Sequence, residues 1–66
     1  MARRADLHVQ GSASVYLIRP VSRCGASWVP EHIPSDAMRF AGVIVVEHRY
    51  IYAIVAGAIA DGLRMR

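Results

Sequence analysis

The apolar positions of this 66-residue chain gather in runs whose residue types predict different elements. Residues 14–19 (SVYLIR) are rich in β-formers and stop at Pro20, which predicts a strand. Its apolar residues do not alternate with polar ones, so we expect both of its faces to be buried. Residues 43–46 (VIVV) are four consecutive β-branched residues and predict a second strand. Residues 63–66 are expected to add a short last strand.

A first helical segment is predicted between these strands. Ser22 is a typical N-cap for a segment over residues 23–32, which would carry Trp28 inward. Pro30 lacks the N–H that would bond back to Ala26, so this segment should be distorted or divided into two parts.

A second helix is predicted over residues 50–60, and Gly62 stands where a C′ glycine is typical. One face follows the spacing i, i+3, i+4, i+7 and should lie on the sheet: Ile51, Ile54, Val55 and Ala58. The opposite side is also apolar: Tyr52, Ala56 and Ile59. A helix that is apolar all round is covered all round, and so short a chain has little left to cover it.

The expected cover is the same helix of a second subunit, related by two-fold symmetry. Ala53, Gly57 and Ala60 form a row of small residues that lets another backbone approach closely. The hydrophobic fraction is 55%, and the single cysteine, Cys24, allows no disulfide within the chain. Because small domains need such a staple or a partner, we expect a homodimer or higher oligomer. Trp28 is expected near the contact as well, because tryptophan is enriched at interfaces.

Together these elements predict one small α/β or α+β domain over residues 13–66, in β-α-β-α-β order. It would hold a three-stranded sheet and two helical segments, of which the second is apolar on both faces. Residues 1–12 are polar and without periodicity, and we expect them to form a flexible arm.

The apolar runs are too short for a membrane span. The longest uncharged run, residues 50–60, falls well below the roughly 20 residues that a span requires. Residues 1–14 have a positive start but no apolar core of the kind that secretory signals carry. We therefore expect a cytoplasmic protein with no membrane partner.

The formal net charge is +3, and all eight basic residues are arginines spread along the chain. No basic run is present, so the charge pattern is a weak signature of nucleic-acid binding. Arginines near the two ends could still contact phosphates: Arg3, Arg4, Arg64 and Arg66. A basic nucleic-acid-binding module is therefore the first alternative.

A charged group, Glu47, His48 and Arg49, separates the second predicted strand from the last helix. These side chains could supply a general base, a proton shuttle and an anion clamp. Neighbours on a strand point to opposite faces, however, and at a strand-to-helix corner the helix N-terminus favours Glu47. We interpret the group as a structural corner, and a small-ligand or anion site there is the second alternative.

No motif for a metal, a nucleotide or another cofactor is present. The candidate zinc ligands fit no zinc motif: His8, Cys24, His32 and His48, with Glu31 or Glu47. The glycines form neither GxGxxG nor a P-loop. We therefore predict no catalytic residue, no metal and no cofactor.

Three motifs carry a resemblance to a known group of proteins. W-x2-E-H-x-P-x-D-A-x2-F-x-G over residues 28–42, VEHRYI over 46–51 and DGL over 61–63 resemble a family of short uncharacterised bacterial proteins. The resemblance implies a small cytosolic bacterial protein, sometimes carried on mobile or prophage-like DNA, and it implies no activity. Pro30 departs from the family's regular helix, and the residues after Tyr52 are more apolar than the family pattern. The expected function is a non-enzymatic, oligomeric interaction or accessory protein.

Overall fold

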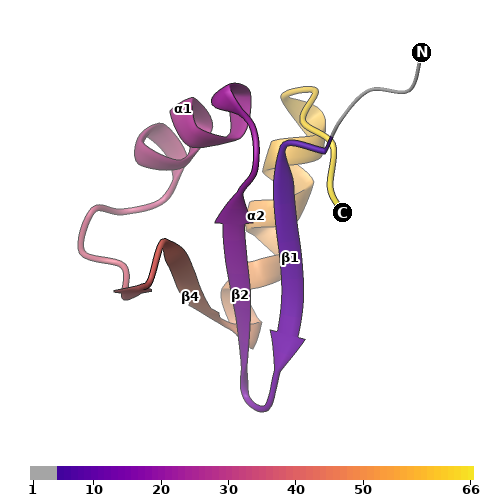
Figure 1. Cartoon of the computed structure of the whole chain (residues 1–66). Coiled ribbons are helices and arrows are strands. Elements are labelled where there is room, and N and C mark those ends of the chain that lie inside the picture. Colours follow the sequence, from indigo (N-terminus) through magenta and orange to yellow (C-terminus); the bar gives the residue numbers. More distant parts are fainter. Residues whose placement is uncertain (1–4) are drawn as a thin grey trace.

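A computed structural model describes residues 5–66, which form a four-stranded antiparallel sheet and two helices (Figure 1). In chain order the elements are β1 (Leu7–Ser12), β2 (Val15–Pro20), α1 (Arg23–His32), β3 (Arg39–Phe40), β4 (Val43–Glu47) and α2 (His48–Ala60). The strands lie in the order β1-β2-β4-β3. The predicted α+β class is confirmed. The predicted three strands and β-α-β-α-β order are wrong, because β1 and β3 were not expected.

The unexpected strand β1 occupies the second half of the predicted flexible arm. It pairs with β2 along its whole length, from Leu7 opposite Pro20 to Ser12 opposite Val15. The turn between the two strands contains Ala13 at a φ of 47°. Hairpin turns of this length usually place glycine or asparagine where φ is positive, so the sequence lacks the usual sign of a hairpin here. The first part of the predicted arm, residues 1–4, lies outside the described residues.

The other unexpected strand, β3, is a two-residue edge strand beside β4. Its turn into β4 consists of Ala41 and Gly42, with φ values of 51° and 78°. Positive φ at both central residues is the type I′ geometry that matches the twist of a hairpin. Glycine adopts this conformation freely, but alanine does so at a cost in energy. Because Ala41 is not a typical residue for such a turn, the sequence did not predict it.

The first helix begins as the sequence predicts. The Oγ atom of Ser22 accepts a 3.0 Å hydrogen bond from the backbone N–H of Gly25, which makes Ser22 the N-cap of α1. The helix then runs unbroken through Pro30, so the expected division into two parts is wrong. Ala26 and Pro30 are both exposed, and water can therefore satisfy the carbonyl that the proline leaves without a partner.

The second helix ends at the predicted glycine. Gly62 has a φ of 89°, its N–H donates to Ile59 O at 2.9 Å, and the N–H of Leu63 donates to Ala58 O at 3.0 Å. These two bonds are a Schellman motif, in which the glycine at C′ turns the chain out of the helix.

The tail after this turn lies beside β1. Met65 forms one parallel bridge with Leu7, so the expected last strand over residues 63–66 is reduced to a single bridge. The N–H of Arg66 donates to Leu7 O, and the N–H of Val9 donates to Arg66 O, both at 3.0 Å. The tail thus covers part of the edge of β1, which would otherwise be free for unwanted pairing.

One hydrophobic core lies between the sheet and both helices. Its buried members come from three strands, from both helices and from the segment after α1: Leu7, Ile18, Trp28, Val29, Ile33, Ile44, Val46 and Ala58. Because both helices join the same core, they cover the same face of the sheet. Figure 1 shows α2 behind the β1–β2 hairpin; this helix contacts β2 and β4, and α1 contacts β2.

The opposite face of the sheet carries no helix within residues 5–66, and we call it the outer sheet face. It holds the strand residues that alternate with the core: His8, Gln10, Val15, Leu17, Arg19, Val43, Val45 and Phe40. Its apolar strand residues Val15, Leu17, Val43 and Val45 are only half-buried. The expectation that the strand at residues 14–19 is buried on both faces is therefore wrong, because no second layer covers it.

Candidate interaction surface on α2

The side of α2 that faces away from the sheet is apolar and open to solvent. Tyr52 is 85% exposed and Ile59 is 57% exposed, with exposed Ala56 between them on the same face. The other side packs inward through three of the four positions that the sequence assigned to it, Ile51, Ile54 and Ala58, of which Ala58 is fully buried. We call the side formed by Tyr52, Ala56 and Ile59 the α2 face.

A groove of about 390 Å³ runs beside the α2 face. It lies between α2 and the β1–β2 hairpin, and its lining is almost entirely apolar: Val9, Tyr16, Ile51, Tyr52, Val55, Ala56 and Ile59. The sequence indicated the helical residues of this lining. It did not indicate Val9 and Tyr16, because the hairpin that brings them there was not predicted.

Trp28, which was expected near the subunit contact, is buried inside the chain and lies away from the α2 face. Its side chain is 6% exposed and belongs to the core. It packs against the inward side of α2, where a Cβ added to Gly57 would lie 3.9 Å from Trp28 Cζ2. Gly57 therefore faces the indole ring of the same chain, with room for ordinary van der Waals contact.

The charged group Glu47, His48 and Arg49 lies at the corner between β4 and α2, as predicted. Arg49 Nη2 is 3.4 Å from Glu47 Oε1, both side chains are largely exposed, and the guanidinium also lies 4.8 Å from the centre of the Tyr50 ring. The His48 ring lies 4.7 Å from that of Tyr16. These groups contact their own neighbours and do not converge on a cavity.

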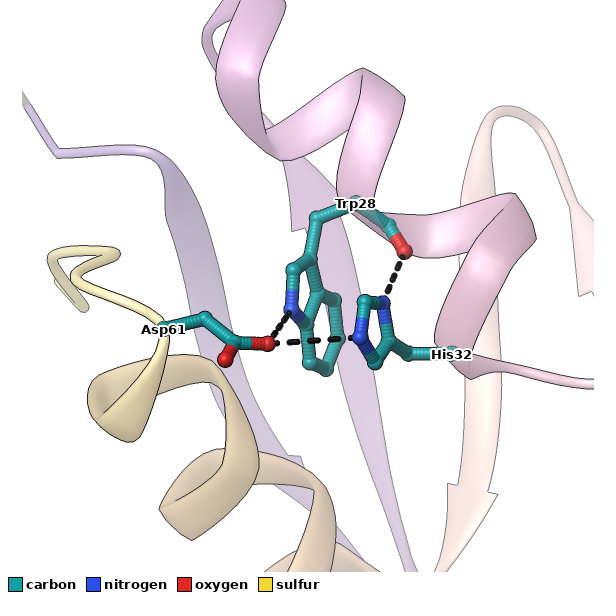
Figure 2. A network of polar contacts seen from close by, with 3 residues as sticks. All are labelled: Trp28, His32 and Asp61. Atoms are coloured by element: carbon teal, nitrogen blue, oxygen red, sulfur yellow. Dashed lines mark hydrogen bonds and ion pairs between the residues drawn. The ribbon is translucent and has the colours of Figure 1, made fainter.

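A polar network that the sequence did not predict joins α1 to the end of α2 (Figure 2). Trp28 Nε1 donates to Asp61 Oδ2 at 2.8 Å, and His32 Nε2 lies 3.2 Å from the same oxygen. The Trp28 and His32 rings stack with centroids 4.3 Å apart and planes within 5° of parallel. The i, i+4 spacing of the two rings in one helix was the available signal for this stack.

The contacts of His32 define what this network can do. Its Nδ1 lies 2.9 Å from the carbonyl oxygen of Trp28, and its Nε2 faces the carboxylate of Asp61. Both neighbours are acceptors, so the tautomer of the ring decides which of them receives its N–H. Among the residues described, no hydroxyl or thiol is hydrogen-bonded to the network. A Ser-His-Asp type of arrangement is therefore not formed, and the network fastens two helices together.

A second junction ties the start of the described chain to its end. Asp6 is 8% exposed, and its carboxylate accepts from Ser22 Oγ at 2.6 Å and from the Arg64 N–H at 2.9 Å. The N–H of Val21 donates to the Asp6 carbonyl at 2.9 Å. The same carbonyl lies so close to α1 that a Cβ on Gly25 would be 2.0 Å from it. Only glycine fits at this point of the helix.

The remaining predicted site residues are scattered. Arg64 and Arg66 lie on the tail beside β1, while the expected contacts of Arg3 and Arg4 lie outside the described residues. Within residues 5–66 no three His, Cys, Asp or Glu side chains cluster as metal ligands would. Neither described helix has the length and apolar character that crossing a membrane requires.

The resemblance of residues 15–64 to short bacterial proteins stays a prediction. Comparison with protein-family models finds no matching family, and searches of the curated proteins and of the solved structures find no significant match.

Proposed function

We propose that this protein is a non-enzymatic, oligomeric interaction protein whose first partner is a second copy of itself, docked on the α2 face. The observation that carries this proposal is the exposed pair Tyr52 and Ile59 beside an apolar groove. Between Arg49 and Asp61 the helix has no charged residue. Removing apolar surface from water is favourable by roughly 25 cal/mol per Å², so covering this side stabilises the assembly.

The spacing of the α2 face suits a symmetric contact. Ala56 lies four residues after Tyr52 and three before Ile59, so it is the centre of the stripe. A two-fold axis near Ala56 pairs the two helices antiparallel and places Tyr52 of each copy against Ile59 of the other. Small side chains at Ala53, Ala56 and Ala60 favour a short distance of about 8 Å between the helix axes.

The charge at the end of the stripe supports the antiparallel orientation. Arg49 precedes Ala56 by seven residues, or about two turns, so it lies on the same side of the helix. In the antiparallel pair its guanidinium comes beside the C-terminal end of the other α2. That end carries partial negative charge, which attracts a cation. A parallel pair would instead bring the two Arg49 side chains together.

The size of the core also favours a partner. The described part of the chain buries eight hydrophobic residues in a single cluster. A domain of this length buries only roughly 60% of the surface of its unfolded chain, which makes its stability marginal. Binding a second copy stabilises the folded state by mass action, since the unfolded chain has no α2 face to offer.

Multi-angle light scattering over a range of micromolar concentrations tests this proposal. We expect a mass near twice the 7.3 kDa of one chain. Ile59→Glu should give a monomer whose circular dichroism remains that of a folded chain, because the side chain is already exposed. The matched control is Met38→Glu, a change of similar kind at a residue that is 69% exposed and lies before β3, where the dimer should persist. A wild-type chain that stays monomeric throughout this range overturns the proposal.

A further inference from the structure

The outer sheet face differs from the α2 face in its chemistry. The register of the strands places His8 opposite Arg19, Gln10 opposite Leu17, and Leu17 opposite Val45. Residues opposite each other in an antiparallel pair share one face, so basic, polar and apolar side chains meet here. The result is a mixed surface, in contrast to the purely apolar α2 face.

A hollow of about 110 Å³ marks the basic end of this face. It is lined by residues from three adjacent strands: His8, Gln10, Leu17, Arg19 and Val43. Nδ1 of His8 is shielded from solvent and has no hydrogen-bond partner among the described residues. Buried polar atoms nearly always have a partner, so an unsatisfied ring nitrogen beside a hollow indicates a partner that residues 5–66 do not supply.

A third basic residue lies next to this hollow. Arg66 lies beside His8. Its N–H donates to Leu7 O and its carbonyl accepts from the Val9 N–H, so it is bonded to both chain neighbours of His8. Arg66, His8 and Arg19 thus form a row across the tail, β1 and β2. The acidic strand residue on this face, Glu47, lies at the other end of β4 and already contacts Arg49. Positive charge therefore gathers at the hollow.

An aromatic ring lies on the far side of the hollow from β1. Phe40 on β3 is 66% exposed and stands opposite Val43, a residue of the hollow's lining. The side chains between these two ends, Leu17 and Val45, are half-buried and apolar. Two arginines beside an exposed ring and an apolar strip offer one ligand both charged and apolar contacts.

We infer that the outer sheet face binds single-stranded nucleic acid. Arg19 and Arg66 neutralise backbone phosphates, the strand supplies the hydrogen-bond partner that His8 Nδ1 lacks, and bases stack on Phe40 and lie over Leu17. Unstacked bases expose the ring faces that such a surface needs, whereas a duplex hides them. A second copy is the poorer occupant of this face, because it would add a second pair of arginines, Arg19 and Arg66, and no free acid to meet them.

Fluorescence anisotropy with a short labelled oligothymidylate, an oligouridylate and a duplex of the same length tests the inference. Both single strands should bind more tightly than the duplex. With two arginine–phosphate contacts, the affinity should fall roughly sevenfold between about 50 and 200 mM salt. Equal binding of duplex and single strand, or an affinity that does not change with salt, overturns the inference.

Three variants locate the site. Arg19→Gln should weaken binding and reduce the slope of log affinity against log salt by about 0.7. Phe40→Leu should weaken binding roughly tenfold and leave that slope unchanged, because a stacked base is lost and no phosphate contact is. Arg23→Gln is the control, since Arg23 is exposed and belongs to α1 on the opposite side of the sheet, and it should bind like the wild type.

These variants also distinguish the ligand from a second copy. Arg19 and Phe40 are both exposed, so both variants should fold. If either variant instead lowers the mass in light scattering and leaves oligonucleotide binding intact, the face contacts another chain and the inference is wrong. The same experiments done on Ile59→Glu should give wild-type affinity per chain, because the outer sheet face does not depend on the α2 face.

Discussion

Nε1 of Trp28 donates a 2.8 Å hydrogen bond to Oδ2 of Asp61, a residue 33 positions further along the chain. The donor belongs to a core residue of α1, and the acceptor caps the C-terminal end of α2. The same carboxylate oxygen faces His32 at 3.2 Å. One side chain therefore holds both helices in their places on the sheet.

Asp61→Ala should destabilise the fold by about 1–3 kcal/mol, because the indole N–H is left without an acceptor in a largely buried position. The opposing gain from removing a negative charge at a helix C-terminus is about 0.3–1 kcal/mol, so the loss of the bond should dominate. Asp61→Asn keeps an acceptor oxygen and should cost less. The free energy of unfolding of the wild type and of both variants is measured by urea unfolding at one chain concentration. The signal is the fluorescence of Trp28, the single tryptophan.

Asp36→Ala serves as the control for this pair of variants. Asp36 is exposed, and such surface changes usually alter stability by less than about 0.5 kcal/mol. If Asp61→Ala were no less stable than Asp36→Ala, the bond to Trp28 would contribute nothing to the fold.

Gly25→Ala should be strongly destabilising even though it lies inside a helix. Helix propensity alone favours alanine over glycine by about 1 kcal/mol. Here the added Cβ would lie 2.0 Å from the backbone oxygen of Asp6, and a backbone atom cannot move aside without disturbing β1. Overpacking of this kind costs about 1–3 kcal/mol or more, so the clash should outweigh the propensity.

The loss in Gly25→Ala is measured by thermal unfolding with circular dichroism. Ser27→Ala in the same helix is the reference, because Ser27 is exposed and alanine is the better helix former. A Gly25→Ala chain that melts at or above the temperature of Ser27→Ala would show that Asp6 does not lie against α1.

Two further glycines should respond to alanine with opposite signs. Gly62→Ala should cost about 1 kcal/mol, because its φ of 89° strains any side chain although the space around it is open. Gly57→Ala should instead stabilise by about 0.5–1 kcal/mol, since Gly57 is inside α2 and its Cβ would meet Trp28 only at 3.9 Å. Urea midpoints that move in the same direction for both variants would contradict this account of the C-terminal end of α2.

The proposed dimer predicts coupling between Tyr52 and Ile59. The two residues are seven positions apart on one helix, where direct contact within a chain is not expected. In the antiparallel pair each contacts the other across the two-fold axis. We therefore expect the two substitutions to be non-additive. The change in the free energy of dimer dissociation in the double variant should differ from the sum for Tyr52→Ala and Ile59→Ala by at least about 0.5 kcal/mol. Strict additivity, measured by analytical ultracentrifugation, would place the helices in another orientation.

The elements that the sequence predicts well are those with strong local signals. Three such signals were found: the four β-branched residues of β4, the Ser22 cap of α1 and the Gly62 ending of α2. Each favours a conformation of the backbone at or next to its own position, so it can be recognised in a single sequence. The exposed side of α2 was visible for the same reason, because helical spacing fixes which residues share a face.

The missed parts depend on chain segments meeting at a distance. Ala13 and Ala41 occupy turn positions with positive φ, so the first hairpin lacks the glycine or asparagine that would identify it, and the second has glycine at only one of its two turn positions, Gly42. The outer sheet face depends on the pairing of β1 with β2. Its row of basic residues, Arg66, His8 and Arg19, also depends on the position of the tail beside β1. The spacing of residues within one element could not have predicted that Arg66 lies beside His8 or that Asp61 accepts a hydrogen bond from Trp28.

The junction of Asp6 with Arg64 has a consequence for how the chain acquires its structure. The bond spans 58 positions, nearly the whole of the described chain, so it can form only after almost everything between has been synthesised. Closing a loop of that length costs roughly 1.2 kcal/mol more in entropy than closing the β1–β2 hairpin, which is about two doublings shorter. The β1–β2 hairpin and the two helices can form earlier, whereas β1 pairs with the tail, residues 63–66, last. The meeting of Asp6 and Arg64 should therefore be a late and slow step of folding.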